Sequence, residues 1–191
     1  MRGLFVVFEG IDGSGKTTLS NGVAGLLRER GLRVEHVREG GTFSSTVTQA
    51  IRELGRDARN LELTPHAELL LYATRDVQLL DEMTRPALER ADVVIADRFL
   101  YSAEVLARYG RGLPEADVMP VLKAAARGLL PDLVVLVDID PHLARARRRV
   151  AKILKPDARP SSRKGLAGVG MQRRLRAVSY THLTLPTILR V

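Results

Sequence analysis

The sequence predicts an α/β protein in which a parallel sheet lies between layers of helices. Strand-like apolar runs alternate along the chain with segments of helical periodicity, the order that parallel sheets with right-handed crossovers produce. Two of these runs, residues 92–97 and 132–138, are almost wholly apolar between acidic ends, which is typical of strands covered on both faces. The length of 191 residues suits one domain with a core of its own.

The first half of the chain opens this alternation. Leu4–Phe8 is a short apolar run that leads into a glycine-rich stretch, so it is predicted to be the first strand. Apolar residues at helical spacing predict a helix from there to Arg30, and Gly31 is a typical residue to end it. A second strand is predicted over 33–37 and a short amphipathic helix over 46–54.

The second half continues with longer helices. Thr64 as N-cap and Pro65 in the first turn predict the start of a long helix. Pro86 is expected either to kink this helix or to begin its last turn. Further helices are predicted over 101–109, over 115–127 and from Pro141 onward. Lys155–Gly170 is rich in proline, serine, glycine and basic residues, so we expect a loop there.

Composition excludes several classes of protein. The chain has no cysteine, which excludes disulfides, thiolate zinc sites and cysteine nucleophiles. The sequence shows neither a secretory pattern nor an apolar run of the ~20 residues that span a membrane, so we expect a cytoplasmic protein without a membrane partner. The net charge of +8 is uneven, with −4 in residues 1–140 and +12 in residues 141–191. The basicity therefore belongs to one segment.

The clearest motif follows the first predicted strand and reads Gly10-Ile11-Asp12-Gly13-Ser14-Gly15-Lys16-Thr17, with Thr18 next. It fits the phosphate-binding pattern G-x-x-x-x-G-K-[ST] between a strand and a helix. In such a loop, backbone N–H groups and the positive end of the helix bind phosphate oxygens. Lys16 is expected to reach the β- and γ-phosphates of ATP, and the Thr17 hydroxyl to ligate Mg²⁺. The alternative is a glycine turn with a solvated lysine.

Other segments of the chain narrow the class of P-loop protein to which this loop belongs. GTPases need an Asn/Thr-Lys-x-Asp segment and ABC-type ATPases a Ser-Gly-Gly signature, and the sequence has neither. Asp97 and Arg98 follow an apolar run, which places a carboxylate for Mg²⁺ beside a cation for a phosphate at a strand end. This pair suits phosphoryl transfer, and a surface ion pair is the alternative.

Taken together, these residues resemble the thymidylate kinase family of P-loop nucleoside monophosphate kinases. The resemblance covers Phe5 to about Arg149. Beyond the loop it rests on Arg38-Glu39-Gly40-Gly41-Thr42, on ELLLYATR at Glu68–Arg75, on Asp97-Arg98-Phe99 with Ser102, and on Pro131-Asp132-Leu133. It implies a P-loop fold and transfer of the ATP γ-phosphoryl group to dTMP, with Mg²⁺ and small-molecule substrates only.

The resemblance also implies roles for single residues. Tyr72 would stack on the thymine ring, Arg75 would reach the base edge or the acceptor phosphate, and Arg98 would grip the acceptor phosphate. The remaining acceptor residues would be Asp12 at the sugar 3′-hydroxyl, Arg38 near the phosphate, and Ser102. Asp97 and Glu9 match family positions at or near the metal.

The chain departs from the family pattern at two places. The segment from Arg38 lacks the proline that the family has after the glutamate, and Leu106 and Ala107 stand where the family has Tyr-Gln, whose Tyr excludes a 2′-hydroxyl. The acceptor base and the choice between deoxyribose and ribose stay open for that reason. One alternative is a kinase of another nucleoside monophosphate, and the other is a P-loop nucleotide-binding protein with a basic nucleic-acid-binding arm.

In the family, the basic segment corresponds to the lid that closes over ATP, here about residues 145–170. Which arginine of the lid is catalytic stays open among its many basic residues; Arg149, which shares a helical face with Arg145, is the candidate. Residues 141–179 contain no aromatic side chain for base stacking, which weighs against a nucleic-acid partner. The resemblance adds a homodimer as an option, for which the sequence shows no interface.

The end of the chain does not follow the family pattern. We expect one kinase domain over 1–176 and an atypical tail over 177–191, interpreted as a replacement of the natural C-terminus. The fifth strand of the family fold is therefore predicted to be missing. The alternative is a genuine short strand over Leu183–Leu189, broken by Pro186.

Overall fold

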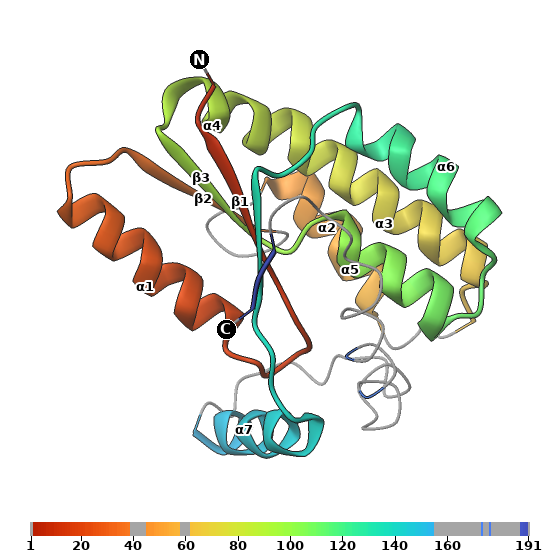
Figure 1. The fold of residues 1–191 in the computed structure, drawn as a ribbon. Coiled ribbons are helices and arrows are strands. Elements are labelled where there is room, and N and C mark those ends of the chain that lie inside the picture. Colours follow the sequence, from red (N-terminus) through yellow and green to blue (C-terminus); the bar gives the residue numbers. More distant parts are fainter. Residues whose placement is uncertain are drawn as a thin grey trace.

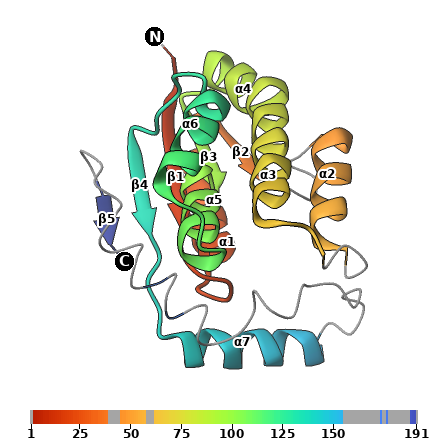
Figure 2. The same cartoon turned by 90° about the vertical axis from the view of Figure 1, so that its right-hand side faces the viewer.

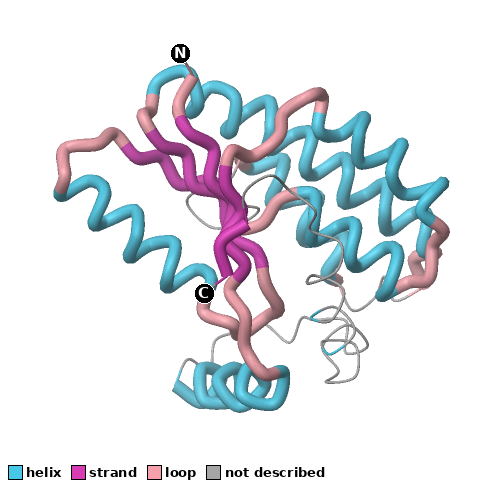
Figure 3. Tube along the Cα trace, viewed as in Figure 1, coloured by secondary structure: helices cyan, strands magenta, loops and turns pink. Residues whose placement is uncertain are grey.

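The computed structural model describes residues 2–38, 45–57, 62–154, 173, 176 and 188–190. Its centre is a parallel sheet of five strands in the order β2-β3-β1-β4-β5. Figure 3 shows these strands between helices on both sides, so the predicted α/β fold with a parallel sheet is confirmed. The strands are β1 (Leu4–Glu9), β2 (Val34–Arg38), β3 (Val93–Asp97), β4 (Leu133–Leu136) and β5 (Ile188–Arg190).

Two helical layers bury the sheet (Figure 1). One face is covered by α1 (Lys16–Glu29), which packs on a core that includes Phe8 and Ile95. The other face carries the fully buried side chains of Phe5 and Val94. Successive side chains of the central strands point to opposite faces of the sheet, and helices bury both faces. The sequences of these strands are therefore continuous apolar runs. The helices of this second side are α3 (Pro65–Leu79), α4 (Arg85–Arg90), α5 (Leu100–Val105) and α6 (Glu115–Ala126).

The long helix of the second half begins as predicted, and a π-helical turn then interrupts its α-helical hydrogen bonding. The Thr64 hydroxyl accepts the N–H of Ala67 at 3.3 Å, and Pro65 lies in the first turn of α3. A π-helical turn, η3 (Leu80–Thr84), joins α3 to α4 just before Pro86. Proline has no N–H to donate and its ring displaces the carbonyl of the preceding turn, so a widened turn accommodates it.

Three further elements frame the site. Ser45 caps α2 (Thr46–Arg56) by accepting the N–H of Thr48 at 3.0 Å. A second π-helical turn, η4 (Leu106–Gly110), extends α5. Figure 2 shows α7 (Pro141–Leu154) across the end of the molecule at which β4 finishes. Of the described helices, none is long and apolar enough to cross a membrane.

The prediction of a missing fifth strand is wrong. Ile188 and Leu189 pair in parallel with Val134 and Val135, so β5 lies at the edge of the sheet beside β4. The physical reason is that the outer backbone groups of β4 need hydrogen-bond partners, which any short extended aliphatic segment can supply. The strand begins two residues after Pro186, which cannot donate a ladder hydrogen bond. The loop predicted over Lys155–Gly170 lies outside the described residues.

Candidate active site

The candidate site lies at the edge of the sheet where β1, β2 and β3 end. Phe8 on β1 and Arg38 on β2 both pair in register with Asp97, the last residue of β3. Ligands of open parallel sheets bind at this carboxyl edge. Three of the predicted groups, namely the loop after β1, Arg38 and the Asp97-Arg98 pair, are therefore neighbours in space. Residues 39–42 of the predicted acceptor loop lie outside the described part.

The loop from Gly10 to Thr17 depends on its glycines. Gly10 has φ 144° and Gly13 has φ 89°, both in the region that L side chains rarely adopt. A Cβ on Gly10 would lie 2.4 Å from the carbonyl oxygen of Val137, and one on Gly13 would lie 2.5 Å from that of Ala144. The loop is thus packed backbone to backbone against the end of β4 and the first turns of α7.

Two side chains of the loop suit a phosphate ligand. The Ser14 hydroxyl is buried and has no hydrogen-bond partner among the residues that the structure describes. Lys16 is 6% exposed, and its ammonium donates to the carbonyl of Ile11 at 3.0 Å. Burial is the main cause that lowers the pKa of Lys16 to about 8, and Arg98 lowers it further. A bound polyphosphate would restore the charge, because a nearby anion favours the ammonium form.

The oxygen ligands predicted for Mg²⁺ lie side by side. The Thr17 hydroxyl donates to Oδ2 of Asp97 at 2.5 Å, although the two residues come from α1 and β3. A hydroxyl and a carboxylate are hard donors that fit Mg²⁺, which takes few protein ligands and completes its shell with water and substrate phosphates. The described part of the chain holds no cluster of three or more His, Cys, Asp or Glu suited to a metal ion.

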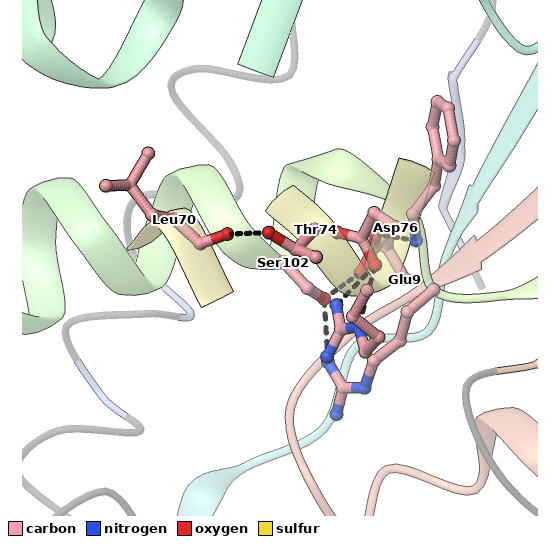
Figure 4. Close-up of polar contacts among 8 residues, drawn as sticks. Glu9, Leu70, Thr74, Asp76 and Ser102 are labelled. Atoms are coloured by element: carbon pink, nitrogen blue, oxygen red, sulfur yellow. Dashed lines mark hydrogen bonds and ion pairs between the residues drawn. The ribbon is translucent and has the colours of Figure 1, made fainter. Parts of the chain in front are cut away.

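Arg98 is the centre of a polar group at the end of β3. Its guanidinium forms an ion pair with Asp12 and donates to Oγ of Ser102 at 2.8 Å. The Ser102 hydroxyl in turn donates to Oε2 of Glu9 at 2.6 Å, and Figure 4 shows these two side chains meeting. Glu9 is almost fully buried, which raises its pKa, while Arg98 and the hydrogen bonds from Ser102 and the Phe99 N–H act in the opposite direction.

The residues predicted on α3 form a second polar group. The guanidinium of Arg75 lies 5.0 Å from the ring centroid of Tyr72 and donates to Oδ1 of Asp76 at 2.6 and 2.8 Å. Asp76 and Arg98 line the same small cavity of about 20 Å³, which is room for a water molecule. The groups on α3 and at the end of β3 therefore face one hollow.

Sequence reasoning missed the support behind this group. The Tyr72 hydroxyl lies 3.3 Å from Oε1 of Glu68, a carboxylate that is 1% exposed. Nε of Arg111, from the segment after η4, lies 2.8 Å from the other oxygen of Glu68, and its Nη2 donates to the carbonyl of Leu63. No spacing rule joins residues so far apart in the chain; the only available signal was an acidic residue on the apolar face of a helix.

The basic helix approaches the loop through residues other than the predicted one. Arg147 and Arg149 are both exposed, but Nη1 of Arg147 lies 3.4 Å from the carbonyl of Ser14, and the half-buried Arg148 packs against Gly13. Ala144 is fully buried against the loop, and positions three and four residues later share its face of the helix. A small residue in an arginine-rich helix was the signal that could have singled out these two arginines.

The sheet order, the loop between β1 and α1, and the acid–cation pair at the end of β3 define a P-loop kinase. Comparison with known proteins then gives the particular family. The thymidylate kinase family model matches residues 8–160 of the chain. The chain therefore belongs to the thymidylate kinase family, and the resemblance seen in the motifs is confirmed.

Individual relatives agree. A thymidylate kinase of Caldanaerobacter subterraneus subsp. tengcongensis is 41% identical over 152 residues, which are 80% of this chain and 72% of the relative. One of Thermoanaerobacter sp. (strain X514) is 38% identical over 148 residues, 78% of this chain and 71% of the relative. One of Bifidobacterium longum (strain NCC 2705) is 41% identical over 150 residues, 77% of this chain and 72% of the relative.

Proposed function

We propose that the protein is an ATP-dependent dTMP kinase that forms dTDP and ADP. A phosphate oxygen of dTMP attacks the γ-phosphorus of ATP, and the bond to the oxygen that bridges the β- and γ-phosphates breaks. The observation that carries the proposal is the adjacency of Lys16 and Thr17 of the phosphate loop to the Asp97-Arg98 pair. This arrangement places cations for a donor and for an acceptor phosphate at one sheet edge.

On the donor side, the loop from Gly10 to Thr18 binds the phosphates of ATP through its backbone N–H groups, the Ser14 hydroxyl and Lys16. The Lys16 ammonium stabilises the negative charge that develops on the β–γ bridging oxygen in the transition state. Arg147 and Arg148 join Arg149 as candidates for the cation from the basic helix, because they already contact the loop.

The metal is a separate part of the proposal. Thr17 and Asp97 would hold Mg²⁺, and Glu9 was predicted to lie near it. When bound, Mg²⁺ neutralises charge on the donor phosphates. Asp97 itself orients the Thr17 side chain, because its Oδ2 accepts a hydrogen bond from the Thr17 hydroxyl at 2.5 Å.

On the acceptor side, Arg98 grips the phosphate of dTMP, and Arg38 lies at the neighbouring strand end. Tyr72 stacks on the base with Arg75 at its edge, and Asp12 and Ser102 complete the predicted set. Ala107 is buried among the helices, and Leu106 beside it brings no hydroxyl to the acceptor side. The preference for a deoxyribose over a ribose acceptor therefore needs a test with acceptors of both kinds.

The deciding experiment is ATP turnover with a panel of dTMP, dUMP, UMP, CMP, AMP and GMP. We expect the highest kcat/KM with dTMP. Turnover without acceptor preference, or only with DNA or RNA, would contradict the kinase proposal, and a different best acceptor would identify another nucleoside monophosphate kinase. The homodimer and the cytoplasmic location stay predictions, which gel filtration and cell fractionation test.

A further inference from the structure

A chain of hydrogen bonds runs from the end of β1 to the guanidinium of Arg98. Glu9 is 4% exposed, and both of its carboxylate oxygens accept hydrogen bonds, from the Phe99 N–H at 3.0 Å and from the Ser102 hydroxyl at 2.6 Å. Oγ of Ser102 accepts from Nη1 of Arg98 at 2.8 Å. A serine hydroxyl has a single proton to donate. Because Ser102 gives that proton to Glu9, it has none left for an acceptor phosphate.

The same carboxylate also holds the backbone that carries Arg98. Arg98 has φ 81°, in a region that non-glycine residues rarely adopt and that persists only where the surroundings hold it. The Arg98 N–H donates to the carbonyl of Phe8 at 3.0 Å, and the next N–H along the chain, that of Phe99, donates to Glu9. The unusual conformation is thus held by β1 from both sides.

We propose that Glu9 and Ser102 are positioning residues for Arg98. Glu9 fixes the backbone through the Phe99 N–H and orients the Ser102 hydroxyl, and Ser102 orients the guanidinium toward the acceptor phosphate. Neither residue contacts the metal or the acceptor. This inference rests on the proposed kinase activity, and it gives both residues roles other than those that the family resemblance implied.

The first test is a double-mutant cycle on the 191-residue chain, with kcat and KM for dTMP measured at saturating ATP. We expect Ser102→Ala to lower kcat/KM for dTMP by about tenfold, the size expected for one hydrogen bond to a charged group. Arg98→Lys cannot bridge Ser102 and Asp12 at once, so in that background Ser102→Ala should cost less than about twofold. An equal loss in both backgrounds would mean that Ser102 acts on the acceptor directly, and it would overturn the inference.

Thr74→Ala is the matched control. Its hydroxyl donates to the carbonyl of Leu70 at 2.8 Å on the exposed side of α3, and Figure 4 draws this hydrogen bond. We expect kcat/KM within about twofold of wild type, as for other exposed surface changes. A loss in Thr74→Ala as large as that in Ser102→Ala would contradict the inference. Wild-type protein that does not phosphorylate dTMP would refute the proposed function instead, so the two failures are distinguishable.

The second test separates positioning from metal binding. We expect Glu9→Gln to lower kcat/KM for dTMP by about three- to tenfold, since one of the two accepting oxygens becomes an amide nitrogen that cannot accept and the charge near Arg98 is lost. The Mg²⁺ concentration for half-maximal activity should stay within about twofold of wild type in both Glu9→Gln and Ser102→Ala. A tenfold higher Mg²⁺ requirement in Glu9→Gln, with an unchanged KM for dTMP, would show a metal ligand and overturn the inference.

Discussion

The phosphate loop from Gly10 to Thr17 takes its shape from eight consecutive residues, whereas the acceptor side joins side chains of β1, β3, α3 and α5. The loop depends on glycines with positive φ and on a close backbone approach, since a Cβ on Gly10 or Gly13 would lie 2.4 or 2.5 Å from a carbonyl oxygen. The acceptor side depends on hydrogen bonds and ion pairs between residues far apart in the chain, such as Ser102 with Glu9 and Arg111 with Glu68. Damage to the loop should therefore affect ATP binding, and damage to the other side should affect the acceptor.

The largest effect is expected at Lys16. Removing its buried ammonium in Lys16→Ala should lower kcat by about 10²- to 10³-fold, the range for a lost group that stabilises transition-state charge. Steady-state kinetics with ATP and dTMP measure it. Arg98→Ala sharpens the comparison, because we expect its loss to fall mainly on the KM for dTMP. If both variants changed the same parameter alike, the division into donor and acceptor sides would be wrong.

The next effect tests the backbone of the loop. Gly13→Ala places a Cβ 2.5 Å from the carbonyl oxygen of Ala144 at φ 89°, so the loop must move. We expect ATP affinity to fall by at least about tenfold and the free energy of unfolding to drop by about 1–3 kcal/mol. Calorimetric titration and thermal unfolding give the two values.

Gly22→Ala is the control for Gly13→Ala. Gly22 lies within α1, where a Cβ meets nothing within 4 Å. We expect this change to stabilise the protein by about 0.5–1 kcal/mol, because alanine favours a helix over glycine. ATP affinity should not change, and an equal loss of affinity in both variants would argue against a special role for the loop.

A smaller effect on activity is expected at the support of the acceptor side. Arg111→Ala leaves the carboxylate of Glu68 buried without that ion-pair partner and should cost about 3 kcal/mol of stability, with a rise of a few-fold in the KM for dTMP. The matched control is Arg90→Ala, whose ion pair with Glu35 is exposed, so the free energy of unfolding should change little. Unchanged unfolding in Arg111→Ala would show that this buried pair does not stabilise the helices.

The smallest effect is a dependence on pH. The pKa of Lys16 is lowered to about 8 by burial, so the ammonium that binds phosphate is lost as the pH rises through 8. ADP affinity should fall by up to about tenfold between pH 8 and 9, with uptake of at most one proton for each ADP bound. Adenosine has no phosphate and should show no such change. Because the folded chain binds fewer protons than the unfolded chain between this pKa and the ordinary 10.5, the same group makes stability rise with pH over that interval.

Sequence patterns and structure agree best where the signal is local. The strands, the cap at Thr64 and the loop of Gly10 to Thr17 were predicted because capping, glycine conformation and apolar periodicity act within a few residues. Pro86 was predicted to kink the long helix or to begin its last turn, and it lies in the first turn of α4; the π-helical turn before it was not predicted. The fifth strand was predicted to be missing because the tail departs from the family pattern, whereas the alternative, a short strand over Leu183–Leu189, overlaps β5 at Ile188 and Leu189.

The sequence by itself determined the class of fold and the donor half of the site. These rest on short-range rules of backbone geometry and on a contiguous motif, and motif order was enough to indicate the kinase family. The tertiary structure alone decided that Ser102 gives its one proton to Glu9, that Arg147 and Arg148 meet the loop, and that Arg111 reaches Glu68. The physical reason is that hydrogen bonds and ion pairs depend on distances of about 3 Å. The packing of helices on the sheet sets those distances between residues that no spacing in the chain relates.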